Sequence, residues 1–165
     1  GSLLQAVALS LELDGDYFES HVQGGNSILR VLHYPPAPDA PDDAPRAGSH
    51  EDINLITLLV GSSADGLEVL DRDGDWIPVR AHSKHLTVNV GDMLQNLTGG
   101  TLRSTTHRVV LPAGDGRKTS RFSLPFFLHP KGEMPLDPIM GDRGAYPCWS
   151  ARAFLDHRLN EIGLK

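Results

Sequence analysis

The sequence breaks into short apolar segments separated by turn residues, and this pattern most constrains the fold. Glycine and proline, with 17 and 12 occurrences, make up 29 of the 165 residues. The apolar segments recur about every ten residues, which is typical of an all-β sandwich or barrel and not of a helical bundle. We predict seven or eight strands, drawn from the segments 27–34, 57–60, 67–70, 76–79, 86–90, 103–111 and 119–128.

Helical patterns are confined mainly to the two ends of the chain. Residues 3–13 carry leucine and alanine at helical spacing, and a short helical turn is predicted at 93–98. Residues 150–162 form the second predicted helix, with Ser150 as its N-cap and Gly163 just beyond its end. We therefore expect a mainly β domain with a helix at each end.

Two segments between the predicted strands lack a regular pattern. The run 37–47 is rich in proline and aspartate and is predicted to be a solvated loop, whereas 129–149 is predicted to be irregular. The polar turn 71–75 lies between two short apolar segments and predicts a hairpin.

Composition excludes several classes of protein. The 15 basic and 21 acidic residues leave a net charge of -6, which argues against a nucleic-acid partner, because phosphate binding needs a basic surface. No apolar run approaches the roughly 20 residues of a membrane span, so no membrane partner is expected. Cys148 is the one cysteine, so no internal disulfide can form, and a reducing cytoplasmic location is expected.

The eight histidines of the chain invite a search for a metal site. Taken singly, each is more often structural than a ligand, and His82, His85 and His157 are expected to face solvent. His50 and Asp52 differ, because residues two apart in an extended segment project to the same face. His107, on a separate predicted strand, is the best candidate for a third ligand.

Two histidines and one carboxylate on one side of an octahedral ion leave three positions open. This is the facial triad of non-heme Fe(II) oxygenases. The spacing of His50 and Asp52 is also compatible with a capping aspartate beside a surface histidine. The spacing alone does not exclude that interpretation.

A second pair of polar residues shares one face of the last predicted strand. Arg121 and Ser123 lie two apart, while Phe122, Leu124 and Phe126 occupy the opposite face. A guanidinium beside a hydroxyl is a good receptor for a carboxylate if this face lines a barrel interior. The pattern alone is equally compatible with a surface arginine.

Several segments together resemble one family. In order and spacing they are similar to the isopenicillin N synthase-like branch of the Fe(II)/2-oxoglutarate-dependent oxygenases, over about residues 3–127. The segments that carry the resemblance are LRVLHYPP, GSHEDINLITLL, DGLEVLDRDGDWIPV, LTVNVGDMLQNLTGGTLRSTTHRVV and SRFSLPFF.

The resemblance implies a fold, a reaction and a site. The fold is a double-stranded β-helix, a distorted jelly roll, and the cofactors and co-substrates are Fe(II), 2-oxoglutarate and O2. It implies that the metal ligands and catalytic centre are His50, Asp52 and His107. It implies that the 2-oxoglutarate residues are Arg121, Ser123 and Tyr34. The expected activity is dioxygenase oxidation of a small-molecule substrate, by default hydroxylation, with release of succinate and CO2.

The chain departs from the family pattern at several positions. Glu51 stands between the two ligands where threonine is common, and it is expected to point away from the metal. Leu32 replaces an asparagine that many plant members carry, and Asn89 and Asp92 are interpreted as structural. Pro125 removes a strand hydrogen bond, which predicts a bulge or a sheet edge there.

Length is the largest departure from the family pattern. Residues 1–165 are expected to form a single catalytic domain that lacks the N-terminal region usual in the family. Apolar surface is therefore expected to be exposed where that region, or a second subunit in a homo-oligomer, would pack.

Two rival functions stay open at this point. One is an oxidase like isopenicillin N synthase itself, which keeps the arginine and serine but uses no 2-oxoglutarate. The other is a truncated or non-catalytic jelly roll that acts as a binding module.

Overall fold

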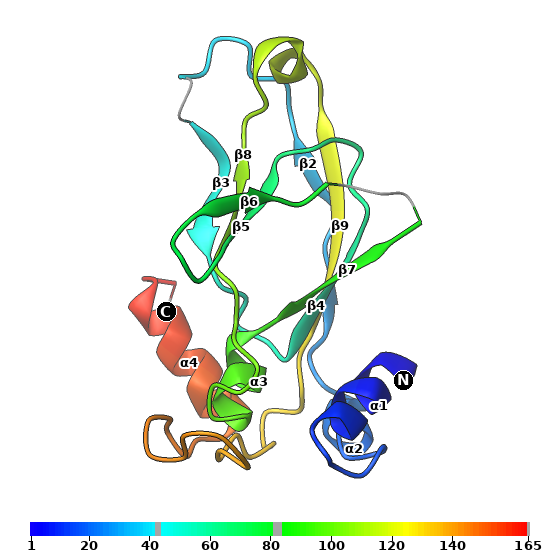
Figure 1. Ribbon diagram of the computed structural model, residues 1–165, viewed down its shortest axis with the longest axis vertical. Helices are drawn as coiled ribbons and strands as arrows, with labels where there is room; N and C mark the ends of the chain where they lie inside the picture. Colours follow the sequence, from blue (N-terminus) through cyan, green and yellow to red (C-terminus); the bar gives the residue numbers. More distant parts are fainter. Residues whose placement is uncertain (42–43, 81–83, 165) are drawn as a thin grey trace.

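The computed structural model describes residues 1–41, 44–80 and 84–164. Within these ranges the chain forms two antiparallel sheets that face each other, with the α-helices gathered at one end (Figure 1). The predicted mainly β jelly-roll fold is confirmed. The larger sheet has the order β1 (Ile28–Leu29), β9 (Arg121–Leu128), β4 (Ile56–Val60) and β7 (Leu86–Val90), and β2 (Leu32–Tyr34) also pairs with β9. The smaller sheet has the order β3 (Pro45–His50), β8 (His107–Val110), β5 (Leu67–Leu70) and β6 (Trp76–Pro78).

The helices are α1 (Ser2–Ser10), α2 (Glu19–Val22), α3 (Asp92–Leu97) and α4 (Ala151–Glu161), and a 3-10 helix spans Gly114–Lys118. The predicted N-cap is confirmed, because the Ser150 side chain accepts a hydrogen bond from the backbone N–H of Ala153 at the start of α4. The helix α1 ends earlier than predicted. Glu12 adopts a left-handed φ of 58°, and the Leu13 N–H bonds back to the Ala8 carbonyl, which closes the helix end.

Most of the predicted strands are present, and the hairpin of β5 and β6 is confirmed. The prediction of one strand over 27–34 is wrong, because two short strands, β1 and β2, pair with β9 there. The prediction of a strand from residue 103 is also wrong. The segment before His107 instead bonds to α3, where the Ser104 N–H donates to the Gln95 side chain. The predicted loop 37–47 is shorter, because β3 begins at Pro45.

Pro125 does not mark a sheet edge. The strand β9 lies inside the larger sheet, and its described pairing with β4 runs from Leu128 to Leu124 without a register shift. The missing N–H of Pro125 coincides instead with the interruption between β1 and β2, where the Arg30 N–H donates to the Pro125 carbonyl. The expected bulge or edge is therefore replaced by a break in the neighbouring strand.

The packed apolar core lies where the helices meet the ends of the sheets, and not in the middle of the space between the sheets. Side chains from α1, α3, α4, β4 and the irregular 129–149 segment form it. Its largest fully buried apolar members are Phe18, Leu55, Ile56, Met93, Leu94, Leu97, Met134 and Leu136. This leaves the middle of the sandwich free for polar side chains.

The outer face of the larger sheet is apolar and exposed. Its neighbouring strands place large side chains side by side, with Val60 paired to both Leu86 and Leu124. These side chains, together with Val88 and Phe122, are between 40% and 51% exposed. Exposed apolar surface is present, as predicted, and we call this set of five residues the outer apolar face.

Among the helices in the described ranges, none combines the length and the apolar character needed to cross a bilayer.

Gly91 closes the turn from β7 into α3, and the close approach of two backbones explains the glycine. A Cβ at this position would overlap the backbone oxygen of Asn54 and its side-chain oxygen. We predict that Gly91→Ala lowers the free energy of unfolding by about 1–3 kcal/mol, as overpacking does elsewhere. Denaturant unfolding followed by circular dichroism measures this.

Gly144→Ala is the matched control, because its Cβ would meet the Asp142 side chain at an ordinary 3.6 Å. Equal unfolding free energies for the two variants would contradict the steric explanation.

Candidate metal and anion site

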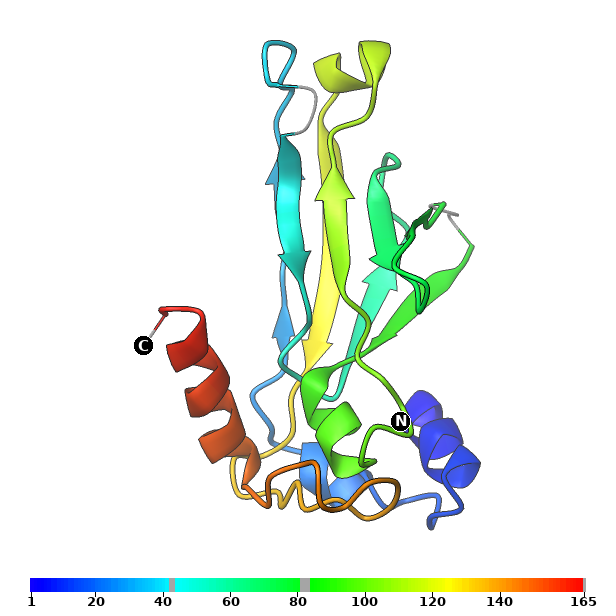
Figure 2. The ribbon, with the colours of Figure 1, turned by 60° about the vertical axis from the view of Figure 1, so that its left-hand side comes forward.

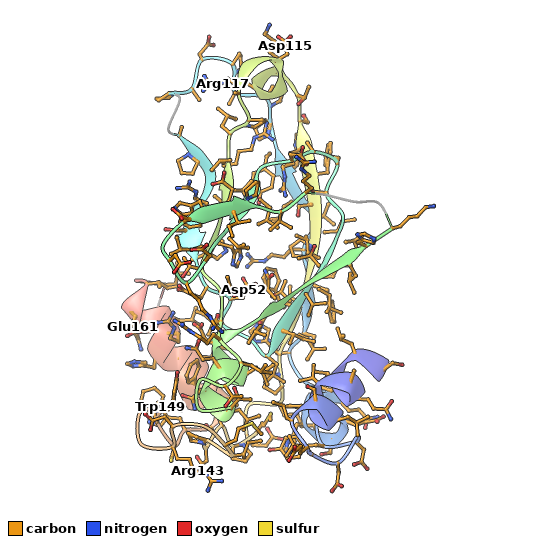
Figure 3. The ribbon with its side chains drawn as sticks, viewed as in Figure 1. Asp52, Asp115, Arg117, Arg143, Trp149 and Glu161 are labelled. Carbon is orange, nitrogen blue, oxygen red and sulfur yellow. The ribbon has the colours of Figure 1, made fainter. Side chains whose placement is uncertain are left out.

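Three side chains that the sequence singled out meet between the two sheets. His50 ends β3 and His107 begins β8, and the register of these strands pairs the two residues directly. Asp52 follows in the loop after β3 and lies in the middle of the molecule (Figure 3). The Nε2 atoms of His50 and His107 lie 3.9 and 3.8 Å from Asp52 Oδ1. The two imidazole rings are 4.4 Å apart, centroid to centroid.

Backbone carbonyls orient both imidazole rings. The Nδ1 atom of His50 lies 2.8 Å from the Gly48 carbonyl, and that of His107 lies 3.0 Å from the Thr105 carbonyl. A carbonyl can only accept a hydrogen bond, so each Nδ1 carries a proton, and in the neutral ring the lone pair then lies on Nε2. Both lone pairs are therefore available to a metal, in the manner usual for metal-binding histidines.

Asp52 is held by side chains that sequence analysis did not identify as functional. The Thr57 hydroxyl donates to Asp52 Oδ2 over 2.6 Å, and the Asn54 amide donates in turn to the Thr57 oxygen over 2.8 Å. All three residues are buried. This chain of hydrogen bonds occupies one carboxylate oxygen and leaves Oδ1 facing the two histidines. The signal in the sequence was a lone threonine in the otherwise apolar strand β4.

The donor set fits a divalent transition metal. Ligand atoms of the three residues lie within 4.8 Å of one another, so small side-chain movements would bring all three within the roughly 2.0–2.2 Å that bonds to one ion require. Imidazole and carboxylate ligands suit iron, and such a set leaves positions open for small molecules. The His50 side chain is 48% exposed and the Asp52 side chain 5%, so the site opens to one side.

Arg121 lies deep in the same cavity, although an arginine is usually found at a surface. It is 1% exposed, and its Nε donates to the Ala64 carbonyl over 3.2 Å. Its Nη1 has no hydrogen-bond partner among the described residues. Burial lowers the pKa of the Arg121 guanidinium, and although Tyr34 and Asp65 oppose that shift and Arg46 adds to it, the pKa stays below its usual value. A buried cation with a free donor is costly unless an anion neutralises it.

The surroundings of Arg121 match a carboxylate receptor. Tyr34 pairs with Arg121 across the β2–β9 ladder, and its ring centroid lies 5.2 Å from the guanidinium carbon. Ser123 is buried two residues further along β9 and lines the same cavity. A guanidinium with an unpartnered nitrogen and an adjacent hydroxyl can bind a carboxylate through several hydrogen bonds. The residues present therefore fit a small carboxylate ligand.

One cavity contains both the metal-binding cluster and the anion receptor. Its wall includes the three candidate metal ligands together with Arg121, Ser123 and Tyr34. Leu32 and Phe127 also line it. Asn89 lines it as well, so its interpretation as purely structural is incomplete. Both groups of side chains therefore face the same space.

The expectation that His85 and His157 face solvent is confirmed, because both are exposed. His157 is half exposed on α4, where its ring packs against Trp149. His82 lies outside the described residues. His129, at the end of β9, is partly buried, and burial lowers its pKa while the charge of Asp52 opposes that shift.

Comparison with known proteins places this site in a family context. The sequence model of the 2OG-Fe(II) oxygenase superfamily matches residues 25–130, which is more than half of the chain. Among curated proteins, 2'-deoxymugineic-acid 2'-dioxygenase from Hordeum vulgare is 35% identical over 93% of this chain and 44% of its own length. Proline hydroxylase buaE from Petromyces alliaceus is 40% identical over 80% of this chain and 44% of its own length.

Solved structures show the same relationship. A Caulobacter crescentus protein assigned to the 2OG-Fe(II) oxygenase family matches with a TM-score of 0.88 and 46% identity, over 97% of this chain and 53% of that one. A full-length Neurospora crassa protein in complex with alpha-KG matches with a TM-score of 0.85 and 32% identity, over 96% of this chain and 52% of that one. The chain thus spans about half the length of the proteins it resembles.

Removal of any member of the cluster is predicted to abolish tight metal binding. We expect His50→Ala, Asp52→Ala and His107→Ala each to weaken Co(II) binding by more than about 100-fold, because loss of a ligand exceeds the 10–100-fold cost of losing a residue behind one. Isothermal titration calorimetry of the metal-free protein with Co(II) measures this.

His157→Ala removes an imidazole that is not part of the cluster and serves as the control. A His50→Ala variant that binds Co(II) as tightly as this control would show that His50 is not a ligand.

Proposed function

The chain belongs to the 2OG-Fe(II) oxygenase superfamily, and from that premise we propose that it is an Fe(II)- and 2-oxoglutarate-dependent dioxygenase acting on a small organic substrate. The observation that carries the proposal is a shared cavity. A two-histidine, one-carboxylate cluster and a buried arginine with an unpartnered nitrogen line the same space. That combination suits a co-substrate with one end for a metal and a carboxylate at the other end.

We propose that His50, Asp52 and His107 hold the iron and that Arg121, Ser123 and Tyr34 hold 2-oxoglutarate. When bound, Fe(II) and 2-oxoglutarate supply an oxidation by O2 that releases succinate and CO2 and by default hydroxylates the substrate. The three ligands come from one side of the cavity, which leaves positions for the co-substrate and for O2.

The roles of the other residues follow from their contacts. Arg121 fixes the far carboxylate of the co-substrate, and the Ser123 hydroxyl donates a further hydrogen bond to it. The Tyr34 ring flanks the guanidinium and limits its movement. Thr57 holds one oxygen of Asp52, so that the other oxygen keeps its direction. The apolar wall around Leu32 and Phe127 keeps water out of the cavity.

We also propose that residues 1–165 act as one catalytic domain in the cytoplasm. A single core cluster joins α1, α3, α4 and the sheet, which supports one folding unit. The lone Cys148 requires no oxidising compartment. The small substrate is supported by the names of the relatives, which refer to small molecules such as proline.

Arg121→Gln tests the use of 2-oxoglutarate. The variant keeps a polar side chain but loses the positive charge. Removing one partner of a buried charge pair costs about 2–5 kcal/mol of binding free energy. At tenfold for each 1.4 kcal/mol, the Kd for 2-oxoglutarate should rise by at least about thirty-fold. Calorimetric titration of 2-oxoglutarate into the Co(II)-loaded protein measures it, together with succinate formation by the Fe(II)-loaded protein.

Arg143→Gln is the control for Arg121→Gln, because Arg143 is an exposed arginine that bonds the Ile139 carbonyl. Oxygen uptake by the Fe(II)-loaded protein without loss of 2-oxoglutarate would favour the alternative of an oxidase like isopenicillin N synthase. Metal binding without any turnover would favour a non-catalytic binding module.

We propose that the outer apolar face is covered by protein in the working enzyme, by further chain of the kind that its longer relatives possess. The relatives are about twice as long as this chain, and Val60, Leu124 and Phe122 form an exposed surface that a soluble monomer rarely keeps free. A second copy of this chain is the competing occupant.

Polar substitution of the outer apolar face tests this assignment. The 165-residue chain should bind an apolar fluorescent dye, and the double variant Phe122→Ser, Leu124→Ser should bind several-fold less. Light scattering after gel filtration should show a monomer in both cases. A discrete dimer that the double variant loses would identify a second copy as the occupant, and a wild-type chain that binds no dye would contradict the proposal.

A further inference from the structure

Glu51 lies between two candidate metal ligands, yet its side chain points away from them. Its Oε1 atom accepts a hydrogen bond from the Thr106 hydroxyl. Thr106 directly precedes His107, the ligand on the opposite strand. This hydrogen bond lies behind the candidate site. It joins the segment that carries His50 and Asp52 to the segment that carries His107.

Arg158 of α4 lies beside the Glu51 carboxylate. Its Nη2 lies 4.0 Å from Glu51 Oε2 and 2.9 Å from Asp92 Oδ2, and its Nε donates to Asp92 Oδ2 over 3.1 Å. Asp92 begins α3, and its backbone N–H donates to the Asp52 carbonyl over 2.9 Å. Arg158 thus bridges two acidic residues, each of which bonds to a ligand-bearing segment.

The helix that carries Arg158 is firmly seated. Its first turn is capped by Ser150, and Ala151 and Phe154 are buried in the core. The helix lies below the end of β3 in both views of the ribbon (Figure 1, Figure 2). Arg158 Nη1 also pairs with Glu161, one turn along the helix, over 2.8 Å. This second pair limits the freedom of the guanidinium, which favours a defined position near Glu51.

This cluster differs from the ordinary surface ion pairs of the chain, which contribute little to stability. The Arg158 and Asp92 side chains are 29% and 9% exposed, whereas those of Arg152 and Asp156 on the same helix are 72% and 35% exposed. A planar guanidinium can engage two carboxylates at once in fixed directions. The arrangement around Arg158 is therefore suited to holding other side chains in place. The exposed pair of Arg152 and Asp156 is not.

We propose that Glu51, held by Arg158, is a positioning residue that fixes the two ligand-bearing segments relative to each other. The inference rests on the proposed function, because it concerns the same metal site. A shorter side chain such as threonine at position 51 could not reach Thr106 and also pair with Arg158. In this chain the C-terminal helix thereby contributes to the metal geometry without contacting the metal.

Four variants test the proposal in the full chain, with Co(II) as the probe. Glu51→Ala and Arg158→Gln should raise the Kd for Co(II) by about 10–100-fold, the usual cost of losing a residue behind a metal ligand. Thr106→Val removes only the hydroxyl at nearly constant volume and should show a similar loss. Arg158→Lys keeps the charge and should recover part of the affinity.

The visible absorption of bound Co(II) provides a readout that a merely structural role would not change. Its bands should shift in the Glu51 and Thr106 variants, because ligand angles change, and should stay unchanged in Arg152→Gln, the control on the same helix. Denaturant unfolding is measured in parallel.

The outcomes separate the two proposals. Wild-type protein that does not bind Co(II) would overturn the proposed function itself. Wild-type protein that binds Co(II), with Thr106→Val and Arg158→Gln matching it in Kd and in spectrum, would overturn the positioning role alone. Variants that lose only unfolding free energy while their Co(II) spectra stay unchanged would also overturn the positioning role.

Discussion

The burial of the Arg121 guanidinium between two sheets is the constraint on which the rest of the structure depends. A cation in such a place needs hydrogen-bond acceptors or an anion around it, and it excludes an ordinary apolar interior. The Ala64 carbonyl satisfies part of this need, and one nitrogen is left without a partner among the described residues. The middle of the sandwich is therefore a polar receptor, and the opposite wall supplies the histidines and the carboxylate.

Because polar side chains occupy the middle of the sandwich, apolar side chains pack in other parts of the molecule. Alternation along β9 directs Arg121 and Ser123 inward, so Phe122 and Leu124 must face outward. The packed core is displaced to the helical end, where Phe18 and Leu94 are buried. One strand thus explains two features at once, the polar cavity inside the sandwich and the apolar surface outside it.

Hydrogen bonds behind the three candidate ligands orient their side chains. Carbonyls set the tautomer of each histidine, and Thr57 sets the direction of Asp52. Glu51 and Arg158 lie further from the candidate ligands. Their ion pair joins α4 to the loop after β3, about a hundred residues earlier in the chain. Preorganisation of this kind keeps a metal site open on one side without loss of geometry.

The sequence by itself determined the fold class, the positions of most strands and the residues worth testing, because strand alternation and ligand chemistry are local properties. The pairing of His50 with Asp52 and of Arg121 with Ser123 could be predicted from a spacing of two. Only the tertiary structure decided which face of β9 is buried, how Pro125 is accommodated, and that Arg158 of α4 reaches Asp92 and Glu51. Those outcomes depend on contacts between residues distant in the chain, and local periodicity carries no information about them.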